Sequence, residues 1–101
     1  PAPTEQVASS LAAVRAAEEA GAKENPEAAL HVKLAQEQLQ QAHELMEHEH
    51  NAKAKDKAMR ARNDAELALS LTHEQQANKK LESFRQAHQT AAQPAPQGDM
   101  Q

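Results

Sequence analysis

The chain has 101 residues, a formal net charge of −4 and no cysteine, and its aromatic content is one phenylalanine, with no tyrosine or tryptophan. The eleven basic residues are interleaved with acidic ones, which gives nucleic-acid binding no electrostatic basis. The missing cysteines exclude disulfides and thiol catalysis. No apolar run approaches the roughly 18 residues of a membrane span. Strong helix formers dominate and glycine occurs only twice, so the composition predicts an all-α protein.

The sequence of the first segment predicts an extended lead-in over residues 1–3, followed by a helix over about residues 4–20. Thr4 is a suitable N-cap, and Glu5 falls in the first turn, where the helix dipole favours an acid. Gly21 can adopt the left-handed conformation that ends a helix. The apolar stripe of this helix is narrow and consists of Val7, Leu11 and Val14.

The second segment predicts a helix over about 26–49. Asn25 and Pro26 form a cap followed by a residue with fixed φ, which is a specific start signal. Two apolar stripes lie about 120° apart on this helix when successive residues are set 100° apart. Since a surface helix shows one stripe, two stripes predict that the segment packs between the helices before and after it. The first stripe contains Ala28, Val32, Ala35, Leu39, Ala42 and Met46, and the second contains Leu30, Leu34 and Leu45.

The third segment predicts a helix over about 52–89, after a turn at His50-Asn51. No glycine or proline enforces this turn, so one continuous helix through position 51 is the alternative. Small side chains that recur at helical spacing allow two helix axes to approach closely. They form one line, here called the alanine line: Ala54, Ala58, Ala61, Ala65 and Ala68.

The third helix is too long for its neighbours. At 1.5 Å per residue it would span roughly 57 Å against roughly 36 Å for the second helix, so an antiparallel pair runs out of partner near Gln76. An apolar stripe continues beyond that point, rotated about 150° from the alanine line. One alternative is that the helix bends between Thr72 and Gln76 and folds back. The other is that the stripe docks on another copy or another protein, through Ala77, Leu81, Phe84 and His88.

These elements predict an up-down-up antiparallel bundle of three helices with an extended third helix, over residues 4–90. Only sixteen large apolar side chains are available, and ordering each residue costs roughly 1–2 kcal/mol of backbone entropy. The isolated monomer is therefore expected to be marginal, which favours self-association or a partner. Residues 91–101 have the composition of a disordered tail.

The six histidines suggest metal binding as an alternative function. His43, Glu47 and His50 fall within about 60° on a helical wheel and carry donors that zinc and copper accept. A di-iron site would need a second Glu-x-x-His pair, which the chain lacks. The serines have no strand-turn-helix elbow and no glycine-rich phosphate loop occurs, so we expect no enzyme activity and no cofactor.

The words AAEEAGAKENPEAALHVKLAQEQLQQAHELM and RARNDAELALSL resemble a family of small bacterial envelope proteins known only as a domain of unknown function. The resemblance covers roughly residues 7–76. Members are typically lipoproteins found beside OmpA-like genes, and they commonly have a Gly-Asp turn where this chain has His50-Asn51. The resemblance implies a periplasmic or outer-membrane location, with any acylated cysteine upstream of Pro1 and with the chain itself or another envelope protein as partner. It carries over no catalytic residue.

Overall fold

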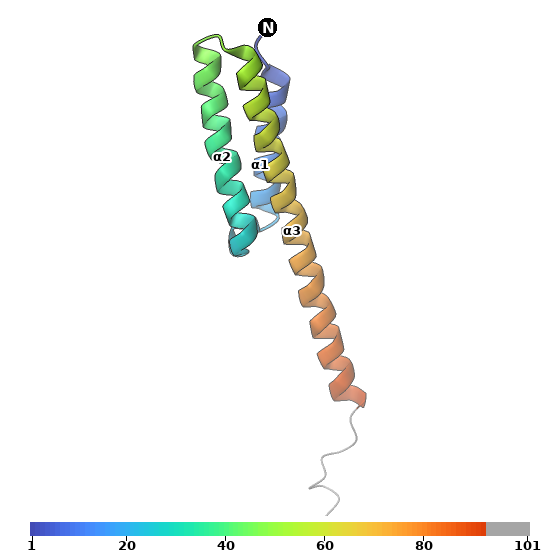
Figure 1. Ribbon diagram of the computed structural model, residues 1–101. Coiled ribbons are helices and arrows are strands. Elements are labelled where there is room, and N and C mark those ends of the chain that lie inside the picture. The colour runs from blue at the N-terminus through green and yellow to red at the C-terminus, as the bar shows by residue number, and fades with distance from the viewer. Residues whose placement is uncertain (93–101) are drawn as a thin grey trace, which may run out of the picture.

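The computed structural model describes residues 1–92 and shows three helices with no strand in that part of the chain (Figure 1). Helix α1 spans Thr4–Glu19, a short 3₁₀ turn η1 spans Ala22–Glu24, α2 spans Pro26–Glu47 and α3 spans Asn51–Ala92. The predicted all-α, up-down-up bundle with a long third helix is confirmed. Residues 91 and 92 continue α3, and the rest of the predicted tail, 93–101, lies outside the described residues.

The two helix starts differ in how they are capped. The side chain of Asn25 accepts hydrogen bonds from the backbone N–H groups of Glu27 and Ala28, at 3.1 and 3.4 Å, so the predicted cap of α2 is present. The prediction for Thr4 is wrong. Thr4 is already helical and Pro3 occupies the cap position without a side-chain hydrogen bond, because the chain turns into the helix one residue earlier than the cap pattern suggested.

A turn separates α2 from α3, which confirms the predicted break and excludes a continuous helix through position 51. The turn occupies His48–His50, one to two residues earlier than the predicted His50-Asn51. The N–H of His50 donates to the carbonyl of Leu45 at 2.8 Å, and that of Glu49 donates to Met46 at 3.0 Å. This pattern is the Schellman ending, whose left-handed residue is usually glycine. Here Glu49 adopts φ 60°, which explains why the sequence contained no glycine signal.

The core is thin and made mostly of alanine. All five residues of the alanine line have no exposed surface, as expected. The larger buried side chains are Val14 on α1 and Val32 and Leu39 on α2. Because alanine adds little bulk, the axes of α1 and α2 lie close to α3, and α3 makes the most extensive contacts with both of them.

The buried face of α1 differs from the predicted stripe. Leu11 is 37% exposed, whereas Ser10 is completely buried beside Val14 and Ala17. The hydroxyl of Ser10 contacts two backbone carbonyl oxygens, that of Gln6 in its own helix and that of Ala58 in α3. A small side chain with a satisfied hydroxyl fits this close approach, and a leucine does not.

The expectation that α2 buries two stripes is also wrong. Its first stripe is buried from Ala28 to Ala42. In the second stripe, Leu30 and Leu34 remain 54% and 36% exposed, and Leu45 is half-buried. One buried stripe is enough because α2 packs mainly against α3, and its contact with α1 is small. The helix that packs against both of the others is α3.

Candidate functional site

The end of α3 extends beyond the bundle as a single uninterrupted helix (Figure 1, orange to red). Gln76 is the last described residue of α3 whose side chain hydrogen-bonds to the rest of the bundle: its amide donates to the carbonyl of Ala20, which follows α1, at 2.8 Å. We call residues 77–92 the projecting segment. Every residue from 77 to 90 is exposed. The structure therefore shows neither the bend near Thr72–Gln76 nor the folding back that was the alternative.

The sequence of the projecting segment explains why nothing in the bundle covers it. Steps of three and four residues continue the alanine line beyond Thr72 on the side of α3 that faces α1 and α2. The positions reached there are polar, so another turn of α1 or α2 would gain no apolar contact. These positions are Lys79, Ser83, Gln86 and Thr90.

The apolar residues of the segment lie on the opposite side of α3. Leu81 and Phe84 are 46% and 58% exposed, and Ala77 and His88 are exposed with them. The rings of Phe84 and His88 are 4.3 Å apart between centroids and inclined by 35°, a contact between residues one turn apart. The structure therefore brings the four predicted residues together on one face, here called the docking stripe, which no other described helix touches.

The histidine cluster is not brought together in the same way. His43 and Glu47 are exposed on α2, while His50 lies beyond the left-handed turn at Glu49. Within residues 1–92 no group of three or more histidine, aspartate or glutamate side chains is placed to hold a metal ion. The predicted site requires α2 to remain helical through His50, and the chain turns before that point.

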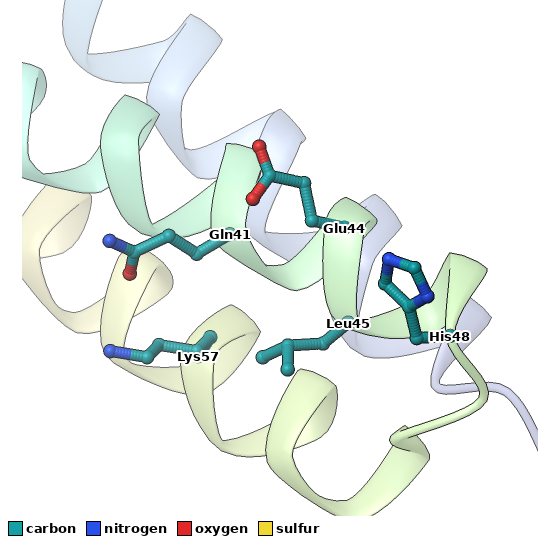
Figure 2. A pocket seen from close by; sticks show the side chains of 5 residues that line it. All are labelled: Gln41, Glu44, Leu45, His48 and Lys57. Carbon is teal, nitrogen blue, oxygen red and sulfur yellow. The ribbon is translucent and has the colours of Figure 1, made fainter.

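One open depression lies between the end of α2 and the start of α3, with a volume of about 400 Å³ (Figure 2). Leu45 forms its floor, and Gln41, Glu44, His48 and Lys57 surround it. The glutamate, the histidine and Gln41 are exposed to solvent. Sequence analysis had not singled out this site, since Lys57 comes from another helix.

Three leucines outside the docking stripe are also exposed, and the sequence pattern did not predict this. Leu30 and Leu34 on α2 belong to its second apolar stripe, which was predicted to pack against a neighbouring helix. Leu67 on α3 is 43% exposed and lies one turn after Asp64, whose carboxylate oxygen is 3.1 Å from Nδ1 of His31 on α2.

The fold and the docking stripe define the class of this protein: an all-α bundle of three helices with a projecting third helix. The chain belongs to the family described as "Domain of unknown function (DUF4398)", which it matches over residues 5–84. The match takes in α1 from Glu5 onward, all of α2, and α3 as far as Phe84. No curated protein and no solved structure matches the chain. In residues 1–92 no helix combines the length and apolar character needed to cross a bilayer.

Proposed function

We propose that this protein is an interaction module of the bacterial cell envelope and that it docks through the stripe on its projecting segment. The observation that supports the proposal is the exposure of Leu81 and Phe84 on a helix with no intramolecular neighbour. An apolar face of this kind on a helix end is typical of helix-to-helix recognition.

The energetics favour a bound state for the segment. Residues 77–90 are exposed on a helix end without tertiary neighbours, whereas most helical stability in proteins comes from tertiary packing of an apolar face. Full burial of a leucine or phenylalanine side chain contributes roughly 1.5–3 kcal/mol, and about half of that remains available at Leu81 and at Phe84. A partner would therefore stabilise the helix while it covers the stripe.

The location in the envelope rests on the family resemblance carried by the AAEEAGAKENPEAALHVKLAQEQLQQAHELM and RARNDAELALSL words. Fractionation of cells that express the complete gene product tests it directly. Recovery in the cytoplasmic fraction would contradict this part of the proposal and leave the docking part unaffected.

The docking part is tested with Leu81→Asp plus Phe84→Asp in the full chain. Both residues are exposed and outside the core, so the variant is expected to keep its helical circular dichroism and its unfolding midpoint. Light scattering gives the mass of the wild type and the variant, and affinity purification from envelope extracts compares the proteins each retains. Loss of assembly in the variant alone supports the proposal. A wild type that is monomeric and retains nothing that the variant does not would contradict it.

A further inference from the structure

The docking stripe has the spacing of a coiled-coil seam. Its residues follow one another at steps of four, three and four, which are the steps between the a and d positions of a heptad repeat: Ala77, Leu81, Phe84 and His88. The two positions that precede Ala77 in this repeat are Ser70 and Glu74, which are polar. The seam therefore begins directly after Gln76, where the hydrogen bonds to the rest of the bundle end.

The charged residues that border the seam are basic on both sides. In a heptad repeat the bordering positions are g, which precedes a, and e, which follows d. With Leu81 at a and Phe84 at d, Lys80 lies at g and Arg85 at e, and both are exposed. The other two bordering positions are uncharged: Asn78 and Ala87. Both edges of the stripe are therefore positive, in a chain whose net charge is −4.

The described residues do not neutralise these edges. Within residues 1–92 no ion pair includes Lys80 or Arg85, whereas Arg60 and Arg62, in the bundle part of α3, each pair with an acidic side chain one turn away at 3.1 Å. Glu82 is the only acidic residue of the projecting segment. It lies at position b, outside the seam, and accepts a hydrogen bond from a glutamine one turn later at 3.4 Å.

Two projecting segments that paired with each other would bring like charges together. In a parallel pair, position g of one helix faces position e of the next heptad in the other helix, so Lys80 would face Arg85. In an antiparallel pair g faces g and e faces e, so lysine would face lysine and arginine would face arginine. Repulsion at these positions disfavours both arrangements, which points to an occupant of different charge.

An acidic amphipathic helix has the complementary character. Apolar residues at its a and d positions would cover Leu81 and Phe84, and acidic residues at its e and g positions would pair with Lys80 and Arg85. The space beside the stripe is open to such a helix. The stripe is rotated about 150° around α3 from the alanine line, which α1 and α2 cover, so a partner can also continue past the end of the bundle.

From these observations we infer that the docking stripe binds an amphipathic helix of another protein, with acidic residues on both sides of its apolar seam. This inference rests on the proposed function, because it names the chemistry of the partner at the same stripe. The apolar contacts hold the two helices together, and the charges at the edges select the partner.

Two synthetic peptides of about three heptads are the probes. Both have leucine at every a and d position. The acidic peptide has glutamate at every e and g position, and the basic peptide has lysine there. Fluorescence anisotropy of each labelled peptide measures its binding to the full-length protein. The dissociation constant of the acidic peptide should be lower than that of the basic peptide by about tenfold or more, which corresponds to about 1.4 kcal/mol.

Three full-length variants connect this preference to the stripe, and circular dichroism verifies that each of them folds. Lys80→Glu plus Arg85→Glu should reverse the preference, because the edges become acidic. Lys53→Glu plus Lys55→Glu is the matched control, since it makes the same change of charge at two exposed lysines near the start of α3, and it should keep the preference for the acidic peptide. The stripe variant, Leu81→Asp plus Phe84→Asp, should bind neither peptide.

The contrary outcomes separate the inference from the proposed function. Equal binding of the two peptides by the wild type, or a preference that Lys80→Glu plus Arg85→Glu leaves unchanged, overturns the inference. Binding of phosphatidylglycerol vesicles and of neither peptide also overturns it, because the occupant is then an anionic membrane surface.

A wild type that binds neither peptide but forms a dimer that the stripe variant loses shows that stripes pair with each other. This result overturns the inference and leaves the proposed function intact. A wild type that binds neither peptide, stays monomeric and retains no envelope protein that the stripe variant loses contradicts both.

Discussion

Replacement of one leucine of α2 at a time separates the buried stripe from the exposed one. Leu39 is 7% exposed and Leu30 is 54% exposed, although both belong to apolar stripes of the same helix. Leu→Ala removes three carbon groups, worth about 2.4 kcal/mol when completely buried at about 0.8 kcal/mol each. Leu39→Ala also leaves a cavity that rigid, alanine-lined helices cannot fill, so we expect a loss of roughly 2.5–4 kcal/mol. For Leu30→Ala the expected loss is about 1 kcal/mol at most.

Urea unfolding followed by circular dichroism at the helical band measures the difference. Both substitutions are made in the variant Leu81→Asp plus Phe84→Asp, because self-association through the docking stripe would add its own stability. The midpoint should fall markedly for Leu39→Ala and little for Leu30→Ala, with the same denaturant slope in both. Equal losses from the two substitutions would refute the assignment of one buried face to α2 and would restore the two-stripe interpretation.

Four further substitutions test local features, each by the same unfolding measurement. Asn25→Ala should lower the free energy of unfolding by about 1 kcal/mol because it removes the cap of α2. Asn25→Asp keeps a cap oxygen and should lower it much less, so equal losses would contradict the cap. Gly21 has φ 99°, so Gly21→Ala should cost about 1–2 kcal/mol through backbone strain alone, since an added Cβ would meet nothing closer than 3.5 Å. Glu49→Gly should stabilise the protein by roughly 0.5–1 kcal/mol by relieving the left-handed φ, and a lower midpoint would show that the glutamate has a role of its own. Ser10→Val should cost roughly 1–3 kcal/mol because the added methyl group overpacks a completely buried position, and no loss would mean that α1 is not held closely against α3.

The amino-acid sequence alone was enough to predict the three helices, their order and the surplus length of α3. Local sequence signals were sufficient to predict features that depend on neighbouring residues. Asn25-Pro26 starts α2, and Gly21 takes the left-handed conformation that follows α1. The alanine spacing marks the buried face of α3. The docking stripe was also visible, because its residues repeat at helical spacing within one element.

Which apolar residues are covered depends on how the three helices pack, and the sequence pattern did not predict it correctly. Ser10 is buried and Leu11 exposed because the close approach of α1 to α3 selects for small size, which a pattern of large apolar residues does not reveal. The metal hypothesis required His50 to lie on the same helix as His43 and Glu47, but His50 follows the left-handed turn at Glu49. Leu30 and Leu34 stay exposed because the other helices cover only the first stripe of α2, and one sequence without its fold does not specify which stripe is covered.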